Sequence, residues 1–290
     1  MAVDQGPVVQ SALLRTELVR LRKEKELTQE QVARSLEWSP SKLIRIEGGK
    51  NAISKTDLQA LLHAYGVTTE SRQEKLQTLA RGAREPAWWT AYRGDIEETY
   101  LNFVGYEAGA ASIRHFHNTV VPGLLQTAEY AEVLTSGSVG PVKVGPVVKL
   151  RLERQRRLAE RENPPRQYYL IDEAAIRRHI GVRTDPAIMS NQLRFIADSA
   201  ERNDLLTVRI IPFSAGAHVG LWGGFSLLEF EGGLDDALYL EGGKSASVLI
   251  TGDDIRVTEY RDAFESLQEE SLSPEDSVRL LRQAAEDLMD

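Results

Sequence analysis

The stretch Leu27–Ser54, LTQEQVARSLEWSPSKLIRIEGGKNAIS, carries the start signals of two short helices separated by a tight turn. Thr28, followed three residues later by Gln31, forms a capping box, which predicts that a helix begins there. The second helix is expected to begin at a capping serine, Ser39, with Pro40 at the first helical position, where the missing N–H costs nothing. Two short helices with so few residues between them must cross at a steep angle.

Three further helices are expected around this pair. Leucines at helical spacing predict a helix over 11–25, ahead of the pair. The second helix of the pair runs over 39–47 and is ended by two glycines. A capping serine starts a fourth helix that ends at Gly66, and a fifth follows over about 69–84. Residues 1–85 are therefore predicted to form an all-α domain of five helices.

The two short helices need small and apolar residues where they touch. Ala33 supplies the small contact, and Leu36, Leu43 and Ile46 supply a shared core. This pattern leaves the opposite face of the 39–47 helix free for contact with DNA. The alternative is a small helical bundle whose charges are only solvated, and the combination of caps, short turn and flanking helices argues against it.

A helix of this kind fits the major groove with its first residues closest to the base edges. Arg45 can donate two hydrogen bonds to guanine, and Ile44 is an apolar side chain suited to a thymine methyl group. Ser41 and Lys42 can reach bases or phosphates. Gln29 begins the preceding helix and is expected to contact phosphate. The full set of predicted DNA-binding residues is Gln29, Ser39, Pro40, Ser41, Lys42, Ile44, Arg45, Lys50 and Asn51.

The quoted stretch resembles the helix-turn-helix of XRE regulators, the Cro/phage-repressor type, in the version common in actinobacteria. The resemblance covers about 11–84 and implies sequence-specific binding to double-stranded DNA. It departs from the family pattern at Glu37, because the turn between the two helices usually carries a glycine in a left-handed conformation there. A non-glycine residue in that conformation costs roughly 1 kcal/mol.

Residues 86–290 are expected to form a second domain of mixed α and β structure. Its predicted helices are 95–116, a segment opening at Pro122-Gly123, 147–162, 172–179, 186–202 and two at the end of the chain, the last starting near Ser273-Pro274. Its predicted strands are 167–171, 206–212, 224–230, 238–241 and 247–251. The Gly-, Pro- and Ser-rich segment 136–146 is expected to be a loop.

Composition narrows the class of protein. The 290 residues are 42% hydrophobic and 27% charged, with no run of about 20 apolar residues that could span a membrane. No secretory signal begins the sequence, and there are no cysteines to form disulfides, zinc–thiolate sites or thiol nucleophiles. We expect a cytoplasmic protein. Residues 1–85 hold 14 Lys and Arg against 11 Asp and Glu, whereas the remainder holds 21 against 32. This asymmetry suits a DNA-binding head on an acidic body.

The second domain carries few signs of catalysis or metal binding. His115 and His117 would share one side of a strand, but their context favours a helix end or a loop, and spacing identifies no third metal ligand. Asp172-Glu173 could be an acid/base pair, although two acids here more simply begin a helix. We therefore expect no catalytic residue, no cofactor and no metal, and keep an enzyme fused to a DNA-binding head as the least favoured alternative.

Two surfaces of this domain leave alternatives open. The helix 149–161 is rich in arginine and is either a solvated face or a docking surface for an acidic partner. Four aromatic residues either belong to the core or line a small-molecule pocket. They are Trp88, Trp89, Trp222 and Phe225.

A second resemblance rests on several short segments between residues 86 and 280. They resemble the domain of poorly known function that follows the XRE head in WhiJ-type, antitoxin-like regulators. The segments are Trp88-Trp89, 121–127, Tyr130-Ala131, Arg154-Gln155, 172–174, Gln192-Leu193, Ile211-Pro212, Gly216 and Phe225. The resemblance implies a regulator paired with a small protein encoded nearby.

Together these features predict a sequence-specific transcriptional regulator. One short recognition helix contacts few base pairs, so a homodimer is expected, with half-sites roughly 34 Å apart. The second domain would supply dimerisation and bind the small protein partner or an effector. The main alternative is a protein-interaction module, an antitoxin whose DNA binding is only autoregulatory.

Overall fold

The computed structural model describes residues 6–49, 52–242 and 247–288. Two compact units make up the chain. The first comprises Met1–Thr90 together with Glu231–Leu234, and the second comprises Ala91–Phe230 together with Asp235–Asp290. Among the described residues, every helix in these two units is too short or too polar to cross a membrane.

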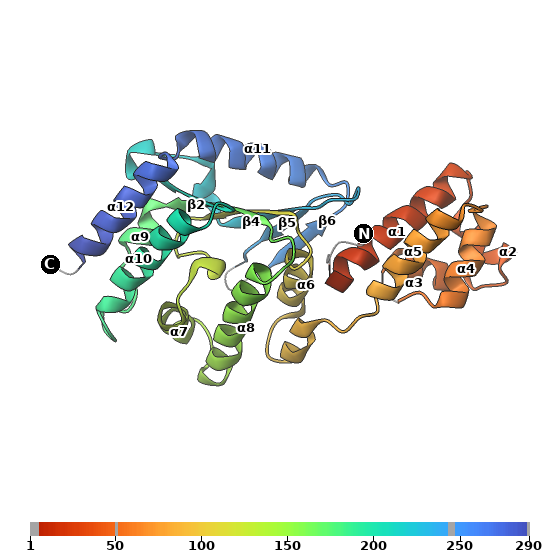
Figure 1. The fold of residues 1–290 in the computed structure, drawn as a ribbon, viewed down its shortest axis with the longest axis horizontal. Coiled ribbons are helices and arrows are strands. Elements are labelled where there is room, and N and C mark those ends of the chain that lie inside the picture. The colour runs from red at the N-terminus through yellow and green to blue at the C-terminus, as the bar shows by residue number, and fades with distance from the viewer. Residues whose placement is uncertain (1–5, 50–51, 243–246, 289–290) are drawn as a thin grey trace. The chain divides into compact units, whose positions relative to one another are not determined.

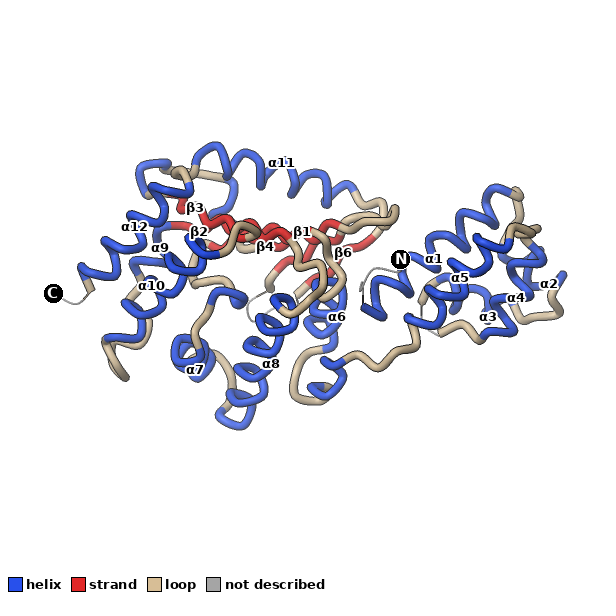
Figure 2. Tube along the Cα trace, viewed as in Figure 1, coloured by secondary structure: helices blue, strands red, loops and turns tan. Residues whose placement is uncertain are grey.

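The first unit contains helices and, within its described part, no strand (Figure 2). The helices are α1 (Gly6–Glu24), α2 (Gln29–Ser35), α3 (Pro40–Glu47), α4 (Lys55–Ala64) and α5 (Glu70–Gly82). This confirms the expected all-α domain with a helix-turn-helix formed by α2 and α3.

Local capping accounts for most of these boundaries. The capping box is present, because Thr28 accepts a hydrogen bond from Gln31 N and the Gln31 side chain accepts one from Thr28 N. Ser39 occupies the N-cap position of α3, but its hydroxyl lies 3.2 Å from the Ser41 hydroxyl and caps no backbone N–H. Helix α1 begins at Gly6, earlier than the predicted residue 11, with Pro7 in the first turn where proline is tolerated.

The helices of the first unit enclose one apolar core. Leu18, Leu43 and Leu61 are each completely buried and come from α1, α3 and α4. Ala33 is also fully buried and is small enough for α2 to approach α3 closely. Leu36 is partly buried against the same core, as the sequence predicted. The recognition helix is therefore held by its apolar face.

The turn between α2 and α3 takes the left-handed conformation that the resemblance to XRE regulators implied. Glu37 has a φ of 55°, in the region that favours glycine. Its side chain is exposed. The only other non-glycine residue with positive φ among those described is Glu26, in the turn that follows α1, at 56°. The helix-turn-helix thus carries local backbone strain that the packed core holds in place.

The second unit is mixed α/β, which confirms the predicted class. Its helices are α6 (Glu98–Glu107), α7 (Ala128–Ser136), α8 (Pro141–Ala159), α9 (Glu173–Arg177), α10 (Ala187–Arg202), α11 (Ile255–Glu270) and α12 (Pro274–Asp287). Its strands are β1 (Ser112–His117), β2 (Arg166–Asp172), β3 (Leu206–Ile211), β4 (Phe225–Glu229), β5 (Ala237–Leu240) and β6 (Val248–Thr251).

The strands form one six-stranded sheet in the order β3-β2-β1-β4-β5-β6. Strands β1, β2 and β3 pair in parallel, and β4, β5 and β6 continue the sheet in antiparallel pairs. Figure 1 shows α11 lying along one face of the sheet, with α6, α7 and α8 on the opposite face. On the α11 side, Phe116, Phe225 and Phe264 belong to a single apolar cluster.

Three predictions for this unit were wrong. Strand β1 lies inside the segment predicted to be helical over 95–116, because its buried polar side chains hide the alternation typical of a strand. Helix α8 begins at Pro141, inside the predicted loop 136–146, since Val144 and Val148 continue the apolar face of the helix despite Pro146. The segment at Pro122-Gly123 forms a separate 3₁₀ turn, Gly123–Leu125, before α7.

Glycine at the strained turn should stabilise the first unit. Because the left-handed strain costs about 1–2 kcal/mol and the extra freedom of unfolded glycine about 0.5–1 kcal/mol, we expect Glu37→Gly to gain about 0.5–1 kcal/mol. Hydrogen exchange of α2 and α3 amides in the full chain would measure this gain. Glu37→Ala keeps the strain and serves as the control. Equal protection in the two variants would contradict the explanation.

Candidate nucleic-acid interface

The position of the recognition helix depends on one carboxylate. Glu47, at the end of α3, accepts hydrogen bonds from Arg22 Nε at 2.8 Å and Arg22 Nη2 at 2.9 Å. It also accepts one from Gln29 Nε2 at 2.7 Å. The remaining guanidinium nitrogen, Arg22 Nη1, donates to the Leu27 carbonyl at 2.8 Å. Glu47 thereby joins α1, α2 and α3 around a single anion.

This ion pair lies largely inside the unit. The side chains of Arg22 and Glu47 are 13% and 4% exposed. Hydrogen bonds to Glu47 raise the pKa of the Arg22 guanidinium, while burial opposes that shift. Charge-assisted, bidentate hydrogen bonds of this kind fix geometry as well as charge. The pair therefore sets where α3 lies relative to the two helices before it.

The outward face of α3 is free. Pro40, Ser41, Ile44 and Arg45 are exposed, and Ile44 retains 51% of its surface. Within the described part of the chain, Arg45 has neither a hydrogen bond nor an ion pair, so its guanidinium can reach outward. Positions 41, 44 and 45 share one face of the helix at the spacing that permits simultaneous contact with one groove. The structure thus brings these predicted residues together.

Lys42 has a second role that the sequence did not indicate. Its ammonium donates to Asp57 Oδ1 of α4 at 2.6 Å and lies 3.9 Å from the centre of the Trp38 ring. The side chain is 35% exposed. Lys42 therefore helps to join α3 to α4, and a contact with DNA would compete with its Asp57 partner.

The residues predicted to contact phosphate differ in their burial and in the groups they present to solvent. Gln29 is half-buried and uses its side-chain amide to bind Glu47, which leaves its backbone N–H at the start of α2 as the outward group. Ser39 is exposed just ahead of α3. Lys50 and Asn51 lie outside the described residues.

The histidines of the second unit are mostly interior. His115 and His117 lie on β1 and are 4% and 7% exposed, rather than at a helix end or in a loop as predicted. Burial lowers the pKa of both imidazoles, that of His115 well below its usual value. His218 Nε2 lies 2.9 Å from Asp172 Oδ2, a buried pair separated by 46 residues that no local pattern indicates. The described residues contain no group of three side chains placed to hold a metal ion.

Most arginines of α8 already have protein partners. Arg156 and Arg157 pair with Glu153 on the same helix face. Arg154 is buried instead and forms a bidentate ion pair with Glu107 of α6, with N–O distances of 2.8 and 2.6 Å. This long-range pair was not anticipated from sequence. The helix therefore has a solvated face of internal pairs and an inward-facing side that carries Arg154.

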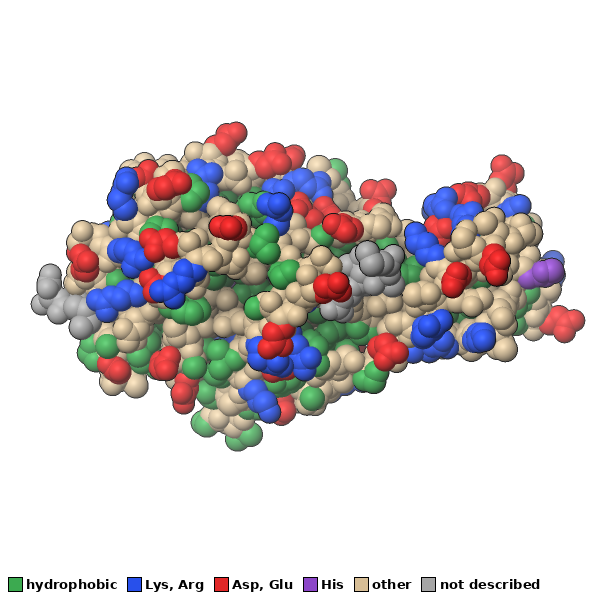
Figure 3. All heavy atoms as spheres, in the orientation of Figure 1, with side chains coloured by type: hydrophobic (Ala, Val, Ile, Leu, Met, Phe, Trp, Pro, Cys, Tyr) green, Lys and Arg blue, Asp and Glu red, His purple; other side chains and the backbone are tan. Residues whose placement is uncertain are grey.

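Figure 3 shows one face of the second unit with charges of both signs. In this view, acidic and basic side chains are interspersed over the visible face of that unit.

The aromatic residues singled out from the sequence differ in burial, because Trp89 and Phe225 are buried while Trp222 is 95% exposed. Trp222 therefore lies on the surface and not in the core, which is one of the two alternatives for these aromatic residues.

Comparison with known protein families gives two matches. Residues 13–76 match the family model described as a helix-turn-helix domain. Residues 100–283 match the family model described as a domain of unknown function, DUF5753. Neither the curated proteins nor the solved structures contain a match. The first match covers the helices that present Arg45, and the second covers nearly all of the sheet unit.

Removing the central carboxylate should loosen the helix-turn-helix. Glu47→Ala leaves the Arg22 guanidinium largely buried without its anion, so we expect a loss of about 3 kcal/mol in unfolding free energy. Urea denaturation of the full chain, followed by hydrogen exchange in α1 to α3, would measure the loss. Arg20→Ala is the control, because its pairs with Glu17 and Glu24 are exposed and should contribute about 0–1 kcal/mol. Equal losses in the two variants would refute the role of Glu47.

Proposed function

This chain belongs to the family defined by the domain DUF5753, and on that premise we propose that it is a transcriptional regulator whose helix-turn-helix domain binds operator DNA sequence-specifically. The proposal assigns the domain to the XRE type and the whole chain to WhiJ-type, antitoxin-like regulators of actinobacteria acting in the cytoplasm. It includes no catalytic activity. The second domain would bind a small protein partner or an effector.

The observation that supports DNA recognition is the free outer face of α3 on a fixed scaffold. Arg45 and Ile44 project from a helix whose other side is packed into the core and tied by Glu47. A preorganised helix loses little conformational freedom on binding, so its side chains can discriminate between bases. In this proposal Arg45 binds guanine, Ile44 meets a thymine methyl and Ser41 reaches a base or phosphate.

A homodimer forms part of the proposal. One eight-residue helix contacts too few base pairs to select an operator, whereas a two-fold pair would bind two half-sites roughly 34 Å apart. Gln29, Ser39, Lys50 and Asn51 would hold the phosphate backbone on either side of α3.

A specific feature of the second unit favours a protein partner. Phe213, Val219, Leu221 and Trp222 are 61%, 50%, 55% and 95% exposed along the segment 213–222. A run of exposed apolar side chains is typical of a protein–protein contact. We propose that this segment, named here the apolar loop, binds the small protein encoded nearby.

The apolar loop is held in place by polar contacts beneath it. His218 pairs with Asp172, and Asn118 Nδ2 donates to the Gly220 carbonyl at 3.2 Å. A Cβ added at Gly220 would lie 2.2 Å from the Phe116 ring, so the backbone packs directly on that ring. Such anchoring lowers the entropy cost of docking a partner.

Replacing the base-contacting arginine should change specificity. We expect Arg45→Ala to lose about 1–3 kcal/mol of binding free energy on the preferred operator and much less on a scrambled duplex of equal length. Fluorescence anisotropy at one fixed salt concentration would measure both, after genome-wide mapping of bound sites has identified the operator. Arg45→Lys retains the charge and should lose specificity while keeping non-specific affinity.

Ser39→Ala supplies the contrasting variant, because the exposed Ser39 hydroxyl caps no backbone N–H of α3 and a phosphate contact carries no sequence information. Its affinity should fall by a similar factor on both duplexes. Unchanged specificity in Arg45→Ala, or a sequence-selective loss in Ser39→Ala, would overturn the assigned roles.

The partner surface can be tested separately from DNA binding. Co-expression with the product of the neighbouring small gene should give a stable complex with the full chain, and Trp222→Ser should weaken it at least about tenfold by removing a buried anchor. Titration calorimetry would measure the change. Val142→Ser is the control, because Val142 is 89% exposed on α8, away from the apolar loop. Equal effects of the two substitutions would rule out the apolar loop as the docking site.

A further inference from the structure

One face of the sheet carries a row of polar side chains where a hydrophobic core is expected. Tyr169, His115, Ser226 and Tyr239 are direct neighbours across β2, β1, β4 and β5. Each is at most 4% exposed. His115 Nδ1 lies 2.6 Å from Ser226 Oγ, and its ring stacks on Tyr169 at a centroid distance of 5.1 Å. Burying polar groups is costly, so such a row calls for a reason other than stability.

A second polar layer lies against this row. The Arg154–Glu107 pair joins α8 to α6, and Arg154 Nη1 also donates to the Tyr100 hydroxyl. His115 Nε2 is buried, has no hydrogen-bond partner among the described residues and lies 4.0 Å from Glu107 Oε1. A buried ion pair stabilises a fold little compared with apolar packing. The Arg154–Glu107 pair and the unbonded His115 Nε2 therefore favour a polar molecule as a binding partner in the interior of this unit.

A cavity of about 350 Å³ opens beside these two layers, within the second unit. Its lining comes from α6, α7, α8, β1, β4, β5, the segments 95–97 and 120–126, and the described residues Val139, Glu241 and Ser247. This volume lies within the range of small-molecule sites, which combine an apolar lining with a few polar groups. One wall is aromatic, because Phe103 and Tyr239 stack with their centroids 4.3 Å apart.

The cavity lining carries charges of both signs, with Asp95, Glu97 and Glu241 as its carboxylates and Arg151 as a cation bonded only to neutral groups. Arg151 Nη1 donates to Gln126 Oε1 at 3.1 Å and to Thr135 Oγ1 at 2.8 Å, both neutral acceptors. No carboxylate of the described residues lies within ion-pair distance of Arg151. His117 lines the same space, 3.9 Å from a carboxylate oxygen of Glu241. Burial lowers the pKa of its imidazole, the Glu241 charge opposes that shift, and the Arg154 and Arg151 charges add to it. A cation without a protein counterion favours an anionic ligand.

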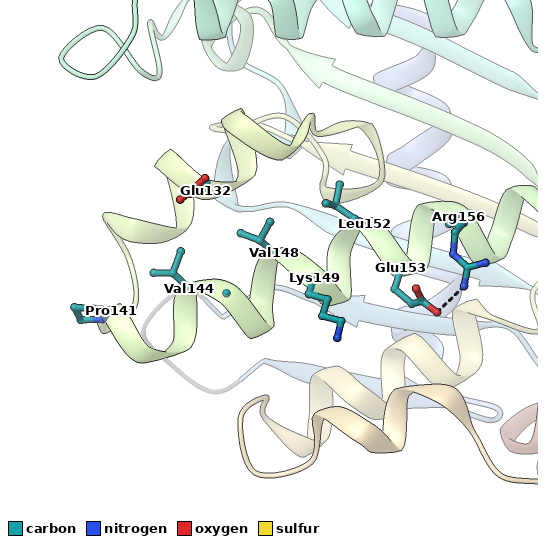
Figure 4. Close-up of a pocket in the computed structure, with 9 residues that line it drawn as sticks. Glu132, Pro141, Val144, Val148, Lys149, Leu152, Glu153 and Arg156 are labelled. Atoms are coloured by element: carbon teal, nitrogen blue, oxygen red, sulfur yellow. Dashed lines mark hydrogen bonds and ion pairs between the residues drawn. The ribbon is translucent and has the colours of Figure 1, made fainter.

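Another depression along α8, lined by Val144 and Val148, has a different character. Figure 4 shows that its lining side chains come from α8, apart from Glu132 of α7. Its charged end is already occupied by the Glu153–Arg156 pair. A surface built almost entirely from one helix encloses no ligand, whereas the cavity beside β1 has walls on several sides.

We propose that the cavity between the sheet, α6 and α8 binds a small organic acid with a flat apolar body. The carboxylate lies against Arg151, within reach of the His117 imidazole, and the flat body stacks against Phe103 and Tyr239. Any control of DNA binding by this ligand rests on the proposed function, whereas the site itself does not.

Gly123 offers a way to fill the site without disturbing its walls. It lines the cavity in an ordinary backbone conformation, and an added Cβ would lie 3.6 Å from Arg154 Nη1 and 4.0 Å from Arg151 Nε. Those are normal contact distances, so Gly123→Val should place its methyl groups beside Arg151. Gly145→Val is the matched control, because a Cβ there meets nothing within 4 Å and Gly145 lines the other depression.

The test uses the full chain with labelled histidines and 2-naphthoate as the probe. We expect saturable shifts of the His117 signals in the NMR spectrum, and binding about tenfold weaker for the uncharged 2-naphthamide. Gly123→Val should abolish the shifts, and Gly145→Val should keep them. Arg151→Gln should reduce the affinity for naphthoate to that for naphthamide.

Three results would overturn the proposal. They are equal binding of the acid and the amide, unchanged binding by Gly123→Val, and no shift of His117 at about 10 mM probe, the limit of a useful affinity. Unaltered signals of His179 and His218, which do not line the cavity, establish that each ligand-free variant has folded. Because no DNA is present, failure of the operator-binding proposal would leave this result interpretable.

Discussion

The hydrogen bonds converging on the Glu47 carboxylate are the constraint on which the DNA-binding surface depends. Arg22 from α1 and Gln29 from α2 meet at one anion at the end of α3. A steep crossing of two short helices has little apolar area to hold it, since α2 and α3 span only seven and eight residues. Directional, charge-assisted hydrogen bonds fix the crossing of α2 and α3, which this small apolar contact alone would hold loosely. The free face carrying Ile44 and Arg45 owes its orientation to this arrangement.

The first unit also contains local backbone strain in the turn between α2 and α3. Glu37 adopts a left-handed backbone in the turn, where glycine would be easier. The cost of about 1–2 kcal/mol is small beside the burial of the leucines that surround it. Lys42 shows a related compromise, because its ion pair with Asp57 joins α3 to α4 at the edge of the proposed interface.

The sheet unit follows a different principle. Its α11 face is an ordinary apolar core, but its α6–α8 face holds a polar row, the Arg154–Glu107 pair and a cavity. The polar row and the buried Arg154–Glu107 pair on this face are better explained by binding than by folding. The apolar loop gives the reverse case, with hydrophobic side chains exposed on a well-anchored segment. Both features are departures from simple burial rules, and both support a domain that binds other molecules.

The sequence by itself determined the helix-turn-helix, its capping box and the mixed class of the second unit. These depend on interactions between residues three or four apart, or on alternation within one segment, which any reader of the chain can count. Only the tertiary structure decided that β1 is a strand, that α8 starts at Pro141, and that Arg154 meets Glu107. The physical reason is that a charged side chain or a histidine can be buried only if it meets a suitable partner. In this protein those partners lie 46 or 47 residues away in the chain, and only folding brings them together.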